Sequence, residues 1–224
     1  MNCTRTDANG QLSFSAFTGS FLMVPSSMTS FYNTGTTVET TRSGRTAYRY
    51  EGTLDIQDSD RICPKCGKKM HVHGGHPIAV QHLNVGGSFG YLSFRRNQLE
   101  CPHCGATVMQ SVPFMADHHR ITKELLQYTK DLLAAGTYPL KQVSEITGLG
   151  RNTVKSIDLK RLQDKYTLDG KTLIKPEQPT RFLGIDEFKL HDGHRYATHI
   201  IDMLTGHILW ISHGKKKQVV YDFI

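Results

Sequence analysis

The chain has 224 residues, 38% of them hydrophobic, and a formal net charge of +7. This length and hydrophobic content favour two or three small domains over one large core. The positive charge lies after residue 60, because residues 1–60 hold more acidic than basic side chains. A basic body of this kind favours a polyanionic partner, with nucleic acid the first candidate. No apolar run is long enough to span a bilayer or to form a signal-peptide core, so we expect a cytoplasmic protein with no membrane partner.

The N-terminal segment, residues 1–45, is rich in Ser, Thr, Gly and Asn. Such a composition rarely sustains a core and predicts a flexible leader. From residue 46 to residue 56 the spacing of Tyr48, Tyr50, Leu54 and Ile56 indicates a strand that enters the next domain.

Two Cys-x-x-Cys pairs follow. Each pair can turn so that two thiolates face one side, and two such turns complete the four-sulfur shell that structural Zn²⁺ prefers. A disulfide or redox role is the alternative, but the chain has no secretory context and two matched pairs exceed one redox motif. Histidines near the first pair could compete as ligands, although four cysteines already fill the shell. The predicted ligands are Cys63, Cys66, Cys101 and Cys104, and the competing histidines are His71, His73, His76 and His82.

Residues between the two pairs predict a β-hairpin. Residues 78–85 and 91–101 are rich in strand formers, and the glycine-rich run 86–90 separates them. Two metal-binding turns at the base of a hairpin outline a zinc ribbon, which we assign to residues 46–115. Strands of this size bury too little apolar surface to fold without the ion.

Three helical segments follow in residues 116–170. Apolar spacing predicts a helix from Ile121 to Gly136, a second helix near Pro139, and a third over residues 151–166. A glycine turn between the second and third predicts a helix-turn-helix, whose third helix would read the major groove. The alternative is a plain helical bundle with a solvated face. The inward positions of the third helix are predicted as Val154, Ile157, Leu159 and Leu162, and the DNA-contacting ones as Arg151, Asn152, Thr153, Lys155 and Ser156.

Residues 171–224 predict a three-stranded antiparallel meander followed by a short helix. An apolar run ending at Ile185 places Asp186 near a strand centre, where we expect it to be partly desolvated, and turn signals lie at 192–193 and 202–206. A two-residue turn would pair Asp186 with His199 and Leu183 with Asp202. Asp202 and Glu187 then lie on the opposite face from Asp186, and Asp202 is best explained as a turn former.

The order of these parts resembles bacterial insertion-sequence DDE transposases of the ISL-three family, from about residue 60 onward. The most specific matching stretches are Gly184-Ile185-Asp186-Glu187-Phe188 and the end of the third helix. The resemblance implies an RNase H-like domain in which three carboxylates bind two Mg²⁺ or Mn²⁺ ions for DNA strand cleavage and transfer. Asp186 matches the first carboxylate, and in the family the other two lie on later elements, beyond residue 224.

The sequence therefore predicts a multidomain α+β protein. It combines a zinc ribbon, an all-α helix-turn-helix and, in residues 171–224, the first three strands of an incomplete RNase H-like domain. We expect a C-terminally truncated transposase that binds double-stranded DNA at transposon terminal repeats, can form a homodimer and does not cut DNA alone. The alternative is a stand-alone zinc-dependent transcription regulator or transposition repressor.

Overall fold

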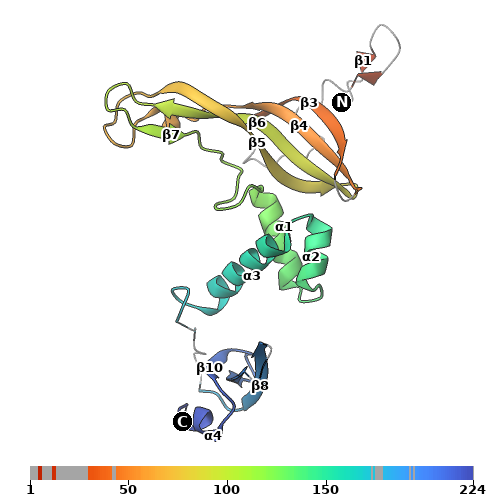
Figure 1. Ribbon diagram of the computed structural model, residues 1–224, viewed down its shortest axis with the longest axis vertical. Helices are drawn as coiled ribbons and strands as arrows, with labels where there is room; N and C mark the ends of the chain where they lie inside the picture. The colour runs from red at the N-terminus through yellow and green to blue at the C-terminus, as the bar shows by residue number, and fades with distance from the viewer. Residues whose placement is uncertain are drawn as a thin grey trace. The chain divides into compact units, whose positions relative to one another are not determined.

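The computed structural model describes residues 5–6, 12–13, 30–41, 44–172, 174, 179–191, 193 and 195–223 (Figure 1). The chain divides into two compact units, residues 1–154 and 155–224. The fold is α+β, as predicted. The elements in chain order are β1 (Arg5–Thr6), β2 (Leu12–Ser13), β3 (Phe31–Thr40), β4 (Thr46–Leu54), the 3₁₀ helix η2 (Asp58–Arg61), β5 (His71–Val85), β6 (Ser88–Glu100), β7 (Thr107–Met109), α1 (Lys123–Ala134), α2 (Leu140–Thr147), α3 (Arg151–Tyr166), β8 (Leu183–His191), β9 (Arg195–Asp202), β10 (Ile208–His213) and α4 (Lys217–Tyr221).

Strand β6 is the centre of the five-stranded sheet in the first unit. One edge of β6 pairs antiparallel with β5, and the other edge pairs with β4 in parallel and then with β7 antiparallel. Gly86 and Gly87 join β5 to β6 with φ angles of 57° and 81°, which a two-residue type I′ turn requires of both its central residues. The predicted hairpin is confirmed, and both of its strands begin earlier in the chain than predicted.

Strand β3 lies inside the segment predicted as a flexible leader. Residues 31–40 pair with β4 along its whole length, so the prediction is wrong for these residues. The ring of Phe31 packs edge-on against Phe94 and Phe114, with ring centroids 5.9 and 6.2 Å apart. A strand with few apolar residues is stabilised here by its backbone ladder and one aromatic anchor. Most of the remaining leader lies outside the described residues.

A buried glutamine fills the gap on β6 between β4 and β7. The Gln110 side chain is fully buried, and its Oε1 accepts hydrogen bonds from the backbone and side-chain nitrogens of Asn97 at 3.1 and 2.9 Å. Its Nε2 donates to the carbonyl oxygens of Leu54 and Asp55, both at 3.0 Å. One side chain thus satisfies backbone groups that the interrupted ladder leaves without partners, which burial would otherwise make costly.

Helices α1, α2 and α3 lie where the sequence predicts them. Thr122 caps α1, because its side chain accepts a hydrogen bond from the backbone N–H of Leu125. Helix α2 ends at Gly148, which has a left-handed φ of 76°. In α3 Val154 and Ile157 are buried as predicted, but Leu159 is half exposed, so its predicted inward position is wrong.

The C-terminus of α2 is bound to the sheet by three side chains. Arg45 donates to the carbonyl of Glu145 at 2.7 Å, Asn84 to that of Ile146 at 2.6 Å, and Gln81 to that of Thr147 at 2.8 Å. These are carbonyl groups that a helix cannot satisfy internally. A Cβ atom on Gly148 would lie 2.4 Å from the Phe89 ring, so only glycine allows this approach.

The second unit contains the predicted meander, with strand order β10-β9-β8 and antiparallel pairing throughout. Asp186 pairs with His199 and Leu183 with Asp202, so both predicted registers are confirmed. A register shift follows Lys189, and His191 pairs with Arg195. The short helix α4 follows β10 as expected.

Replacing Gln110 with Leu should lower the free energy of unfolding of the zinc-bound chain by about 2 to 4 kcal/mol. The substitution keeps the volume but removes hydrogen bonds to the buried carbonyl of Leu54 and to the partly buried carbonyl of Asp55 and N–H of Asn97. Urea unfolding monitored by circular dichroism measures the change. Gln142→Ala, at an exposed position of α2, is the control and should stay within about 0.5 kcal/mol of the parent chain. Equal stability of the Gln110→Leu variant and the parent would contradict this role of Gln110.

Candidate metal centre and nucleic-acid interface

The two cysteine pairs form two matching turns. The backbone N–H of Gly67 donates to the carbonyl of Cys63, and that of Gly105 to the carbonyl of Cys101, each at 2.9 Å. The glycines have φ angles of 69° and 68°, in the left-handed region where a side chain is strained. Each turn therefore has the same backbone geometry and directs its cysteines to one side.

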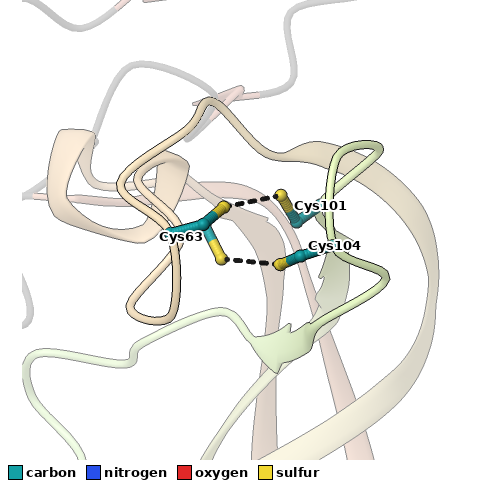
Figure 2. A group of neighbouring side chains, drawn as sticks. Cys63, Cys101 and Cys104 are labelled. Carbon is teal, nitrogen blue, oxygen red and sulfur yellow. Dashed lines mark hydrogen bonds between the residues drawn. The ribbon is translucent and has the colours of Figure 1, made fainter.

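The four sulfur atoms of these turns lie within 4.8 Å of one another. Cys63 Sγ lies 3.6 Å from Cys104 Sγ, and Cys66 Sγ lies 3.5 Å from Cys101 Sγ (Figure 2). These separations are too long for a disulfide, whose S–S length is about 2.05 Å. They are close to the separation of about 3.8 Å expected for a tetrahedral ion with Zn–S bonds of about 2.3 Å. The arrangement is that of a structural Zn²⁺ site, and the four cysteines are free thiols in the structure.

The protein backbone prepares these thiols for metal binding. Burial raises the pKa of Cys63, but the N–H groups of Cys66 and Lys65 lower it to about 7. The pKa of Cys101 is lowered in the same way, against burial, by the N–H groups of the second turn. The N–H of Lys68 lowers the pKa of Cys66, yet burial and the three neighbouring thiols raise it to about 12. Four thiols this close cannot all ionise unless a cation neutralises them, which a divalent metal does.

A small apolar cluster surrounds the metal site. Cys63 and Cys101 are buried with Met70 and Leu99, and Ile56 packs against the group. The competing histidines do not join it. His71, His73 and His76 are exposed, while His82 is buried at the far end of β5 with its Nδ1 3.0 Å from the hydroxyl of Thr122. Burial lowers the pKa of His82, which favours its neutral form.

The predicted DNA-contacting residues lie in the first two turns of α3. Arg151, Asn152, Lys155 and Ser156 are exposed and Thr153 is partly exposed, whereas Val154 between them is buried. Just before α3, the Ser144 hydroxyl donates to the carbonyl of Leu149 at 2.6 Å. Together with the left-handed Gly148, this bond fixes the turn between α2 and α3. The polar side of α3 is thus free to meet a ligand.

Asp186 lies in the middle of β8 and is exposed. This corrects the expectation that it would be partly desolvated beside Ile185. The neighbouring carboxylates do not join it, because Glu187 and Asp202 lie on the other face of the sheet by register. Asp202 is buried and accepts hydrogen bonds from the Thr205 hydroxyl at 2.6 Å and the Leu204 N–H at 3.1 Å. The Thr205 bond lowers the pKa of Asp202, and these contacts agree with its predicted role as a turn former.

The side chains that dock α2 onto the sheet were not identified from sequence. Gln81, His82 and Asn84 are consecutive or nearly consecutive polar residues at the end of a strand otherwise rich in apolar residues. Polar side chains inside a buried strand indicate that another element supplies their hydrogen-bond partners. Which element supplies them depends on long-range contacts that sequence spacing does not contain.

Comparison with known proteins matches two segments of the chain to transposase families. Residues 59–104 match the family described as the zinc-finger of transposase IS204/IS1001/IS1096/IS1165, and residues 183–224 match a DDE family described as a transposase. Both matched segments are thus similar to families of ISL-three transposases. The zinc-finger match and the four-cysteine cluster support structural Zn²⁺ as a cofactor. The match to a DDE transposase family implies a divalent metal for catalysis.

A curated relative gives the extent of the match. The transposase for insertion sequence element IS1001 of Bordetella parapertussis is 29% identical over 163 residues, which is 72% of this chain and 38% of the relative. The chain thus matches well under half the length of that ISL-three transposase. No solved structure is significantly similar to the chain. No helix in the described ranges is long and apolar enough to cross a membrane.

The reduced chain should bind one Zn²⁺, and Cys101→Ser should abolish stoichiometric binding. Loss of one thiolate opens the shell, and structural zinc sites contribute about 10 to 16 kcal/mol of binding free energy to folding. Elemental analysis after gel filtration measures the zinc content, and circular dichroism follows unfolding of the ribbon. Cys3→Ser is the control and should retain the ion. Unchanged zinc content in the Cys101→Ser variant would rule out the four-cysteine site.

Proposed function

We propose that this chain is the DNA-binding part of an insertion-sequence transposase. It binds double-stranded DNA at the terminal repeats of its element through the zinc ribbon and through a helix-turn-helix made of α2, the turn at Gly148 and α3. One observation carries the proposal. The exposed polar start of α3 follows a turn whose preceding helix is fixed to the ribbon's sheet by three hydrogen bonds.

The exposed residues of α3 have the chemistry of a reading surface. Arg151, Asn152 and Lys155 make no side-chain hydrogen bond or ion pair with other residues of the described part of the chain. Arginine can donate two hydrogen bonds to guanine and asparagine can bind adenine in the same bidentate way, whereas lysine acts as a point charge on phosphate. A solvated helix face in a bundle more often forms the i,i+4 ion pairs seen further along α3, between Lys160 and Asp164.

The rigid link between ribbon and α2 supports a shared DNA-binding role. Arg45 also places its guanidinium 4.4 Å from the centre of the Phe89 ring, so the sheet holds this side chain on two sides. A reading helix is useful only if its support is stiff, because specificity needs a fixed register on the duplex. The ribbon supplies that support, and the positive charge of the chain after residue 60 supplies attraction to phosphate.

Alanine at Arg151 or Asn152 should reduce the affinity for terminal-repeat DNA by about 1 to 3 kcal/mol and reduce discrimination against random duplex. Lys155→Ala should weaken binding to both duplexes alike, because a phosphate contact is independent of sequence. Fluorescence anisotropy with both duplexes at about 150 mM salt separates the two effects. Gln163→Ala, exposed near the other end of α3, is the matched control. Full affinity of a triple Arg151, Asn152 and Lys155 alanine variant would exclude α3 as the reading helix.

We further propose that β8, β9 and β10 are the opening strands of an RNase H-like nuclease domain, with Asp186 as its first metal-binding carboxylate. The match of residues 183–224 to the transposase family supports this assignment. A two-metal site needs several carboxylates that bridge or flank both ions. The described residues do not form one, because Glu187 and Asp202 lie on the face opposite Asp186.

The chain should show no strand cleavage or strand transfer by itself with Mg²⁺ or Mn²⁺. A single exposed carboxylate binds such an ion weakly and cannot fix two of them for an in-line displacement. Gel assays on terminal-repeat DNA test this, with Asp186→Ala beside the parent chain. Both should bind DNA equally, because Asp186 is not in the reading helix. Cleavage by the parent that disappears in the Asp186→Ala variant would show that another carboxylate, or a partner chain, completes the site.

A further inference from the structure

A run of three lysines follows β10 in the second unit. Lys215, Lys216 and Lys217 are exposed, and none of them forms an ion pair with another residue that the structure describes. Three adjacent ammonium groups repel one another, so such a run is more stable beside an anion than in isolation. Neither the metal site nor the reading helix uses them.

The start of this run is held in place by the sheet. The N–H of Gly214 donates to the carbonyl of Tyr196 at 2.7 Å, and the Thr198 hydroxyl donates to the carbonyl of Gly214 at 2.8 Å. Gly214 has a φ of 108°, a conformation that only glycine adopts easily. The Lys215 ammonium lies over the Tyr196 ring, 4.2 Å from its centre. Lys215 therefore lies at a fixed place, so binding a ligand costs its side chain less conformational entropy.

The register of the sheet assigns the lysines to a face. Tyr196 pairs with Lys189, three residues after Asp186, which pairs with His199. Because side chains alternate along a strand, Tyr196 and Lys189 lie on the face opposite Asp186. Lys189 is exposed on this face.

Few carboxylates of the described residues lie near the three lysines. Glu187, across from Thr198, is exposed there, and the exposed Asp222 of the segment after α4 accepts a hydrogen bond from Gln218. Asp202 belongs to this face by register, but it is buried and bonded to its own turn. Among the described residues, the three ammonium groups of the run thus outnumber these two exposed carboxylates.

We propose that Lys215, Lys216 and Lys217 form a second DNA contact that binds the phosphate backbone without regard to sequence. This phosphate-binding surface rests on the proposed DNA-binding function. It lies beside Tyr196 at the start of α4, while the centre of that sheet face, at Thr198 and Ile200, is buried. Lysine suits this task because its ammonium is a point charge that does not read base edges. The fixed Lys215 sets the position of the other two along the backbone.

The salt dependence of DNA binding by the full chain tests this surface. Each phosphate that is no longer neutralised lowers the slope of log K against log salt by about 0.9, so a Lys215→Gln, Lys216→Gln, Lys217→Gln variant should show a slope smaller by about 2.7. Its preference for terminal-repeat over random duplex should stay as in the parent chain. The matching triple arginine variant, which keeps the charge, should keep most of the slope. An unchanged slope in the glutamine variant would overturn the proposal.

A site-specific crosslink distinguishes a local contact with DNA from a general effect of the net charge of the chain. Benzoylphenylalanine at position 196 should crosslink to DNA under ultraviolet light, whereas the same group at Phe182, which precedes β8, should crosslink much less. Equal yields at both positions would contradict the assigned surface. Trp210 packs against Phe223 on this sheet, so its fluorescence reports whether each variant is folded. If a triple variant fails this check, Lys216→Gln alone should reduce the slope by about 0.9.

The results distinguish a failure of the lysine surface from a failure of the proposed reading helix. Loss of sequence preference in the Asn152→Ala variant with a normal salt slope supports the helix and leaves the lysine surface intact. An unchanged sequence preference in the α3 variants refutes the proposed helix-turn-helix. A lysine variant with reduced slope then still supports a backbone contact in the second unit.

Discussion

The last carbonyl groups of a helix have no partners within the helix, and in α2 three of them receive hydrogen bonds from the sheet. Arg45, Asn84 and Gln81 supply these bonds from β5 and from the residue before β4. The arginine also places positive charge at the negative end of the helix dipole. The direction in which α3 leaves the following turn depends on this anchor, since the turn at Gly148 is itself pressed against Phe89. The ribbon is therefore the support of α2 and of the turn into α3, as well as a metal site.

The zinc site and the α2 anchor lie at opposite ends of the β5–β6 hairpin, and each solves a different problem. At the open end, near Cys101, the sheet buries only a small apolar cluster. The bound ion therefore supplies stability that the burial of apolar side chains does not. Between the two ends, the side chain of Gln110 occupies the gap along β6 between the part paired with β4 and the part paired with β7. At the turn end, polar side chains bind a helix instead. Strand β6 runs through all three regions and pairs with β5 along most of its length.

Sequence reasoning succeeded where the signal was local. The cysteine turns, the Gly86-Gly87 hairpin, the bounds of α3 and the register around Asp186 follow from spacing over a few residues. It failed where the signal was distant. Strand β3 looks like a polar leader because its stability comes from pairing with β4 and from Phe31 packing on Phe94 and Phe114. The parallel pairing of β4 with β6, the short β7 and the role of Asn84 likewise depend on partners tens of residues away. Periodicity assigned Leu159 inward, but periodicity carries no information on where a covering element ends, and that side chain is half exposed.

The two proposed DNA contacts place different demands on the chain. Reading bases through Arg151 and Asn152 requires angstrom-level placement, and the hydrogen-bonded anchor of α2 together with the Ser144 bond to Leu149 provides it. A phosphate contact through Lys216 tolerates any sequence and many positions along the duplex, so it requires no fixed geometry between the two units. In these two proposals the first unit would select the site, and the lysines of the second unit would add attraction to the same DNA that does not depend on sequence. Specificity and attraction would then be separated between the two units, and only the first would depend on zinc.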